Sequence, residues 1–196
     1  MFRDMPQAVE VTQGALMGLE AWRKAQGLEQ SRLLDQIGPD TGKLLAILLA
    51  GAPAGDAVEI GTGAGYSGLW LALACRATGR RLRTYELDPA KSELARQSFF
   101  AAAVLDVVDF VQGDGLTGLS EGKALAFCFV DAGCGLAREA YELALPRLLQ
   151  GGLICVAKAI SHAAEFQDFL DDATSDPRVD AVIVPIGSGL LVCRKV

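Results

Sequence analysis

The chain has 196 residues, of which 51% are hydrophobic and 21% charged, and its formal net charge is −6. This composition excludes a disordered chain. Basic residues do not cluster beyond Arg80-Arg81-x-Arg83, so we do not expect a nucleic-acid surface. No apolar run reaches the roughly 18 residues of a membrane helix, and we identify no signal peptide. Five cysteines without a C-x-x-C spacing indicate reduced thiols in a cytoplasmic protein.

Helical segments are predicted before the first strand. Apolar spacing predicts an amphipathic helix over residues 5–24, a short helix over 28–36, and a third helix over 39–50 that Pro39 opens. We expect residues 1–52 to form a helical extension. It would pack against the rest of the chain, cover a ligand or provide a dimer surface.

From residue 53 onward, predicted strands and helices alternate. Strands are predicted at residues 58–60, 82–87, 107–112, 125–130, 152–159, 179–185 and 189–195, and helices at 67–78, 89–103, 136–149 and 163–173. This alternation predicts an α/β, doubly wound, Rossmann-like fold with a mostly parallel seven-stranded sheet and a C-terminal antiparallel hairpin. We expect one domain over residues 1–196, with its core at 53–196 and its ligand at the carboxyl ends of the strands.

The most informative stretch runs from Ala57 to Leu73, where an apolar run, three alternate glycines and an apolar helical pattern follow one another. This order predicts a strand, a tight turn and a helix. Glycines at 61, 63 and 65 permit positive φ angles and let a ligand lie against bare peptide. The first N–H groups of the following helix would face that ligand, so we expect it to carry a carboxylate or another acidic group.

Two kinds of ligand suit such a turn. Residues 63–68 spell G-x-G-x-x-G, which favours a dinucleotide and an NAD(P)-dependent oxidoreductase. The glycines nevertheless begin at Gly61, and Glu59 stands at the end of the strand. A carboxylate at that position suits a cationic amine and repels a pyrophosphate in a poorly solvated cleft. The chain also lacks an evident Y-x-x-x-K set for hydride transfer, so the oxidoreductase is the less favoured alternative.

The fuller pattern E-x-G-x-G-x-G resembles the first motif of S-adenosylmethionine (SAM)-dependent methyltransferases, and E-I-G-T-x-x-G-Y-S is similar to the catechol and caffeoyl-CoA O-methyltransferase family. The resemblance begins near Gly38 and extends to the run L-L-V-C-R-K at residues 190–195. It implies the methyltransferase version of the fold, SAM as cofactor, O-methylation of a small-molecule acceptor, and a homodimer.

The resemblance also implies a set of cofactor-binding residues. Glu86 closes the second strand, where an acidic residue accepts hydrogen bonds from ribose hydroxyls. Asp114 matches an adenine-side position, although an ordinary turn aspartate is an equal alternative. The full set is Ile37, Glu59, Gly61, Thr62, Gly63, Gly65, Tyr66, Ser67, Glu86, Leu87, Asp114, Gly115 and Asp131.

The family's metal site is expected to be absent. Asp131 occupies the position of a family aspartate that lies near the cofactor and binds a divalent metal. The two further family ligands, Asp and Asn, align with Ala157 and Lys158. Alanine has no donor atom and lysine brings a positive charge, so one carboxylate would remain, which is too few for Mg²⁺ or Ca²⁺.

Asp131 and Lys158 are the catalytic candidates. The Lys158 ammonium would replace the metal, pair with Asp131 and stabilise a phenolate or carboxylate of the acceptor. If burial lowers its pKa, Lys158 could instead act as a general base, which a neighbouring Asp131 would oppose. A third possibility is a plain ion pair in a SAM-binding protein that has lost catalysis.

Overall fold

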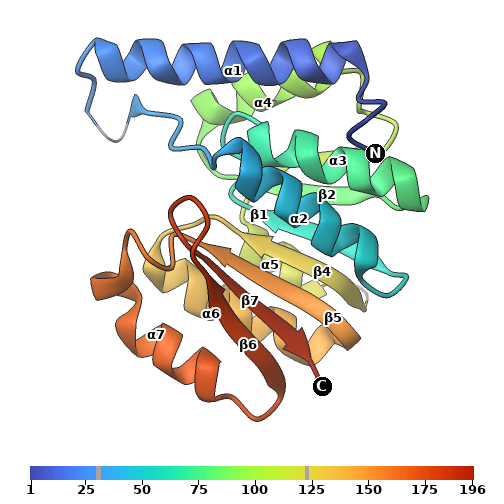
Figure 1. The fold of residues 1–196 in the computed structure, drawn as a ribbon, viewed down its shortest axis with the longest axis vertical. Helices are drawn as coiled ribbons and strands as arrows, with labels where there is room; N and C mark the ends of the chain where they lie inside the picture. Colours follow the sequence, from blue (N-terminus) through green and yellow to red (C-terminus); the bar gives the residue numbers. More distant parts are fainter. Residues whose placement is uncertain (30–31, 122–123) are drawn as a thin grey trace.

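A seven-stranded sheet in the order β3-β2-β1-β4-β5-β7-β6 forms the centre of the computed structural model, which describes residues 1–29, 32–121 and 124–196 (Figure 1). The strands are β1 (Asp56–Ile60), β2 (Leu82–Glu86), β3 (Val108–Gln112), β4 (Leu125–Val130), β5 (Leu148–Ala157), β6 (Val179–Val184) and β7 (Leu190–Lys195). The first five pair in parallel, whereas β7 runs antiparallel to both β5 and β6. The predicted sheet and its closing hairpin are confirmed.

Helices cover both faces of this sheet. They are α1 (Gln7–Ala25), α2 (Pro39–Gly51), α3 (Tyr66–Thr78), α4 (Pro89–Ala101), α5 (Gly115–Glu121), α6 (Cys134–Ala144) and α7 (Ala163–Ser175). The first four lie toward one face, where α1 forms an outer layer, and the last three lie toward the other (Figure 1). None of the described helices combines the length and the apolar character needed to cross a membrane.

Strand β4 shows why both faces must be covered. All six of its residues are buried, and from Phe127 to Val130 they alternate between two apolar clusters. Phe127 and Phe129 face the α1–α4 side, whereas Cys128 and Val130 face the α5–α7 side. A continuous apolar run is typical of a strand in a doubly covered parallel sheet.

The predicted helix at 28–36 is wrong for the residues that the structure describes; residues 30 and 31 lie outside them. Residues 34–38 have no regular secondary structure, yet Leu34 is only 3% exposed. The Leu34 N–H donates to Glu20 Oε2 at 2.8 Å, and the Gln36 side-chain amide donates to the Leu16 carbonyl at 3.0 Å. Contacts with α1 therefore hold residues 34–36 in place without a helix.

Several predicted boundaries also differ. The helix expected at 136–149 ends at Ala144, because a 3₁₀ turn, Leu145–Arg147, contains Pro146, which has no N–H for a helical hydrogen bond. Strand β5 therefore begins earlier than expected, at Leu148, and ends at Ala157. Helix α5 was not anticipated.

The sheet positions the candidate site between β1 and β4. These strands are neighbours in parallel register, with Ile60 opposite Val130. The chain leaves β1 toward α3 on one face and β4 toward α6 on the other, so a crevice opens beyond their carboxyl ends. The Asp131 N–H donates to the Ile60 carbonyl at 2.9 Å, which holds the two strand ends together at this crevice.

Candidate functional site

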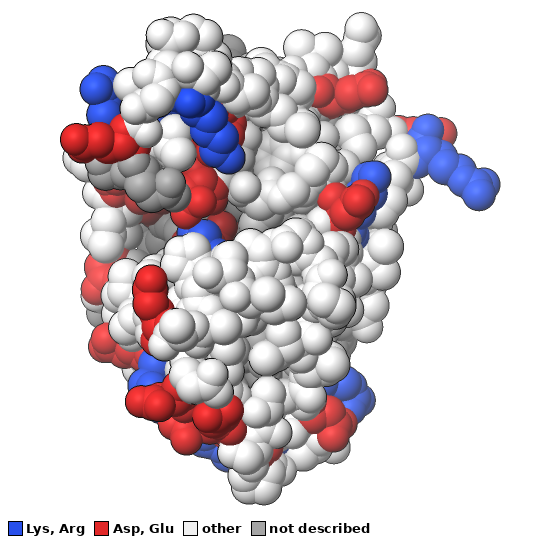
Figure 2. Space-filling view, turned by 60° about the vertical axis from the view of Figure 1, so that its left-hand side comes forward, with Lys and Arg blue, Asp and Glu red and all other residues white. Residues whose placement is uncertain are grey.

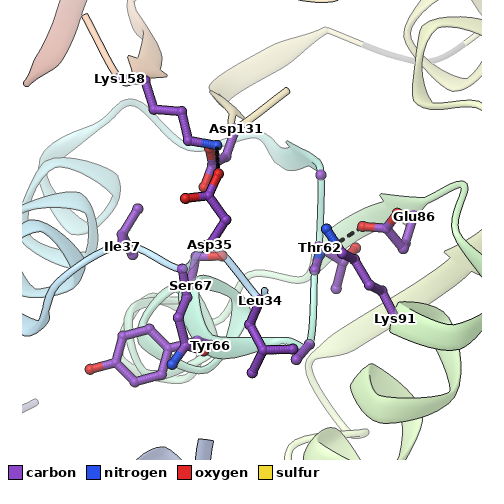
Figure 3. A pocket seen from close by; sticks show the side chains of 14 residues that line it. Leu34, Asp35, Ile37, Thr62, Tyr66, Ser67, Glu86, Lys91, Asp131 and Lys158 are labelled. Atoms are coloured by element: carbon purple, nitrogen blue, oxygen red, sulfur yellow. Dashed lines mark hydrogen bonds and ion pairs between the residues drawn. The ribbon is translucent and has the colours of Figure 1, made fainter. Parts of the chain in front are cut away.

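A pocket of about 430 Å³ lies at the carboxyl ends of β1, β2, β4 and β5 (Figure 3). A second hollow of about 780 Å³ adjoins it, since both are lined by Gly61, Glu86, Lys91, Asp131 and Lys158. The predicted cofactor residues that line the first pocket are Ile37, Gly61, Thr62, Gly63, Tyr66, Ser67, Glu86 and Asp131. Those that line the second hollow are Gly61, Glu86, Leu87, Asp114, Gly115 and Asp131.

The glycine turn shapes the first pocket. Gly61, Gly63 and Gly65 all have positive φ angles, as their spacing predicted. Gly65, at φ 95°, is the N-cap residue of α3. The turn thereby directs the positive end of the α3 dipole toward the pocket, which suits an anionic group. Gly65 itself does not line the pocket; a side chain at this position would meet the Phe99 ring.

Glu86 ties this turn to the end of β2. Its Oε2 accepts a hydrogen bond from the Gly63 N–H at 2.8 Å, and its Oε1 accepts one from the Asp88 N–H at 2.9 Å. Asp88 in turn caps α4 by accepting from the Ala90 N–H at 2.7 Å. The Glu86 carboxylate is thus held at the rim shared by both hollows.

Glu59 lies beneath the turn and not in the lining of either hollow. It is fully buried, its Oε2 accepts from the Thr84 hydroxyl at 2.5 Å, and that hydroxyl also contacts the Thr62 hydroxyl at 2.5 Å. Oε1 is buried and has no hydrogen-bond partner among the described residues. Burial raises the pKa of Glu59 to about 7, although hydrogen bonds from Ser67 and Thr84 oppose the shift.

An ion-pair cluster stands where the two hollows meet (Figure 3). Lys158 Nζ lies 3.0 Å from Asp131 Oδ1 and 2.7 Å from Asp35 Oδ2. The Lys158 and Asp131 side chains are 18% and 10% exposed, whereas that of Asp35 is 42% exposed. The pairing of Lys158 with Asp131 agrees with the sequence interpretation, while Asp35 is an additional partner that no motif indicated.

The charges of this cluster decide its protonation. Burial acts to lower the pKa of Lys158, but the charge of Asp131 and the hydrogen bond with Asp35 outweigh burial, so that pKa is raised. Burial raises the pKa of Asp131, and the charge of Lys158 opposes that shift. The raised pKa favours the ammonium form of Lys158 and does not support the alternative that it is a general base.

The donor set does not fit the family's divalent metal. The position at the end of β5 is the apolar Ala157, which is 2% exposed, and the next residue is the Lys158 cation. Its ammonium already binds both nearby carboxylates, Asp131 and Asp35. Within the described parts of the chain, no three His, Cys, Asp or Glu residues gather in a metal-binding group.

On the far side of the second hollow, Asp114 serves as a local cap. Its Oδ1 accepts from the Leu116 N–H at 2.9 Å, and its Oδ2 accepts from the Thr117 hydroxyl at 3.0 Å. The Asp114 carboxylate therefore behaves as that of an ordinary turn aspartate, although the residue also lines the hollow. Gly115 must be small, because a side chain there would meet Ile60 and Tyr85.

Several lining residues had no signal in the sequence. Leu34, Asp35 and Gln36 come from the segment wrongly predicted to be helical, and Lys91 comes from the first turn of α4. The Tyr66 hydroxyl donates to Met17 Sδ of α1 at 3.4 Å. Long-range packing, which local patterns do not record, brings these residues together.

The sheet order, the glycine turn after β1, the acidic residue ending β2 and the antiparallel β7 define an α/β protein of the methyltransferase class. The family description "O-methyltransferase" matches residues 19–196. The chain belongs to this O-methyltransferase family, which agrees with the sequence resemblance and not with the oxidoreductase alternative.

Individual relatives support this assignment. A protein of Mycolicibacterium vanbaalenii, provisionally named an O-methyltransferase, is 31% identical over 182 residues, covering 81% of this chain and 76% of its own. Caffeoyl-CoA O-methyltransferase 1 of Eucalyptus globulus is 27% identical over 181 residues, covering 80% of this chain and 73% of its own. The Bacillus cereus O-methyltransferase, solved in complex with SAH, has a TM-score of 0.75 at 24% identity and covers 95% of this chain and 91% of its own.

Proposed function

We propose that the protein is a SAM-dependent O-methyltransferase that methylates a hydroxyl of a small molecule without a divalent metal. Metal-free catalysis is proposed because the Lys158 ammonium lies between Asp131 and Asp35, where the two hollows meet. Related structures support the cofactor, because the Bacillus cereus enzyme was solved with SAH and TomG of Streptomyces achromogenes with SAM.

The residues of the first pocket suit the amino-acid part of SAM. The α3 N-terminus with Ser67 would bind its carboxylate. Glu59, whose buried Oε1 lacks a partner among the described residues, would stabilise its ammonium from beneath the turn. The remaining members of this half are Ile37, Gly61, Thr62, Gly63, Gly65 and Tyr66.

The second hollow suits the adenosine part. Glu86 stands at the rim, where its carboxylate would accept hydrogen bonds from the ribose hydroxyls. Leu87, Asp114 and Gly115 lie further along and would border the base. Asp131 lines both hollows and would lie beside the reacting part of the cofactor. SAM supplies the methyl group when it is bound.

Catalysis would combine positioning with electrostatic stabilisation. The Lys158 ammonium would hold the acceptor oxygen and stabilise its developing negative charge. Asp131, 3.0 Å away, would keep Lys158 charged and oriented. In the family, a metal would hold two oxygens of the acceptor. Here the Lys158 ammonium would hold one.

The proposed partners follow from the surface. On the face shown in Figure 2, basic side chains are dispersed among acidic ones and a broad area carries no charge, which supports a small-molecule acceptor over a nucleic acid. We further propose a single methyltransferase domain and a homodimer, for which α1 exposes Val11, Met17 and Trp22.

Five free cysteines, four of them buried, support a reducing, cytoplasmic setting.

Transfer of a labelled methyl group from SAM to a panel of small hydroxyl compounds tests the proposal. We expect methylation of at least one compound at equal rates in EDTA and in Mg²⁺. Methylation that stops in EDTA and returns with Mg²⁺ would contradict metal-free catalysis. SAM binding without turnover of any compound would favour the drifted SAM-binding protein.

A further inference from the structure

Asp35 stands in an unusual backbone conformation at the mouth of the site. It lies between α1 and α2, outside regular secondary structure, and its φ angle is 52°. Its ion-pair partner Lys158, directly after β5, has a φ angle of 67°. Asp adopts such angles more readily than most residues other than glycine, whereas for Lys they are unfavourable and the surrounding contacts must hold them. The Lys158 end of this ion pair is thus held in place at an energetic expense.

Only one oxygen of the Asp35 carboxylate contacts Lys158. Its Oδ2 lies 2.7 Å from Lys158 Nζ, while its other oxygen points away from Lys158, on the side of Ile37 (Figure 3). Because the side chain is 42% exposed, a proton taken up by the carboxylate could pass to water. Asp35 can therefore accept a proton within contact distance of the cation that would hold the acceptor oxygen.

The other charged groups that line the two hollows are less suited to this task. Lys158 remains protonated, and the 10% exposed Asp131 has no comparable route to solvent. Both oxygens of Glu86 accept backbone hydrogen bonds, and both oxygens of Asp114 cap α5. Lys91, the remaining charged group of the lining, is a cation.

We infer that Asp35 is the catalytic base that takes the proton from the acceptor hydroxyl while Lys158 holds its oxygen. This inference rests on the proposed methyl transfer. The acceptor oxygen forms a bond to the methyl carbon, the carbon–sulfur bond breaks with its electron pair going to sulfur, and the hydroxyl proton goes to the Asp35 carboxylate. A carboxylate is a weak base, so the acceptor class is a hydroxyl of appreciable acidity, a phenol, and one phenolic oxygen suffices.

The test compares two acceptors with different needs for a base. The first is the simple phenol that the wild-type protein methylates best, which is protonated at the assay pH. The second is its nitro-substituted analogue, which is already ionised in solution. We expect Asp35→Asn to lower kcat for the first phenol by a factor of about 10² to 10⁴, the usual contribution of a general base. For the ionised analogue we expect a change below about threefold, because no proton remains to be removed.

Two controls separate this role from a structural one. Asp35→Glu should recover part of the rate with the protonated phenol, and Asp40→Asn, the same change at an exposed position of α2, should leave both rates unaltered. Calorimetry should show SAM binding to Asp35→Asn within about threefold of wild type, because the variant retains the shape of the residue. Equal losses with both phenols would overturn the inference.

The remaining outcomes are also decisive. If the wild-type protein binds SAM and methylates other hydroxyl compounds but no phenol, the inference fails and the proposed methyl transfer survives. If the wild-type protein does not bind SAM, the proposed function itself fails.

Discussion

The backbone carbonyl of Asp131 occupies the space where a side chain on Gly61 would begin. Gly61 also has a φ angle of 93°, so both its conformation and its surroundings require glycine. The contact joins the turn after β1 to the end of β4, and it sets the width of the crevice in which we place the cofactor.

Gly61→Ala should therefore damage stability and binding together. The strained φ angle and the clash with a backbone atom should lower the free energy of unfolding by about 2 kcal/mol or more. SAM affinity should fall more than about tenfold, because the turn must move. Urea denaturation and calorimetry measure the two effects. Gly14→Ala on the exposed face of α1 is the control, and it should raise stability by about 0.5–1 kcal/mol.

Lys158→Met should remove the cation and retain most of the side-chain length. We expect kcat to fall by a factor of about 10² to 10³, since one preorganised electrostatic group is lost. The mostly buried Asp131 would lose its partner, so unfolding should require about 3 kcal/mol less at pH 8.

Lys43→Met provides a matched control, because Lys43 pairs with the exposed Asp40 at 3.2 Å. Its effect on stability should stay below about 0.5 kcal/mol. Adding Asp131→Asn to Lys158→Met should restore much of the stability but not the rate. A double variant no more stable than Lys158→Met would show that the lost stability does not come from an unpaired Asp131.

The sequence predicts some parts of this site and not others. The sheet, the hairpin and the turn at Gly61–Gly65 follow from apolar runs and glycine spacing, which are local signals. Asp35 follows from no such signal, because its place depends on how Leu34 and Gln36 bind α1. Leu33 and Leu34 are buried, and tertiary hydrogen bonds of Leu34 and Gln36 hold this part of the segment without a helix. The pairing of Lys158 with Asp131 was predictable only because both follow neighbouring parallel strands.

Glu59 predicts a specific dependence of stability on pH. Its pKa is raised from 4.5 to about 7 in the folded protein, so between these values the folded state binds more protons than the unfolded state. The free energy of unfolding contributed by this group should fall as pH rises through that window, by about 3 kcal/mol in total. Urea denaturation from pH 4 to pH 8 measures it. Glu59→Gln should remove this part of the slope, and an unchanged slope would contradict the assignment.

The cysteines predict a simple chemical pattern. Cys134 is the one free cysteine of the five that is not buried. Burial raises the pKa values of Cys75, Cys128 and Cys193 to about 12, which disfavours their reactive thiolates. A thiol reagent should modify one cysteine in the native protein and all five after unfolding. Cys134→Ser should abolish the native reaction, and rapid modification of several cysteines in that variant would show that the buried thiols are accessible.

Calorimetric titration of SAM into the full chain, in EDTA and again in Mg²⁺, tests the central claim most directly. We predict saturable binding of one SAM per chain with the same affinity in both buffers, because the described residues around Lys158 provide no set of metal ligands. NAD should not bind. Absence of SAM binding in both buffers would contradict the account, and binding of NAD in its place would favour the oxidoreductase.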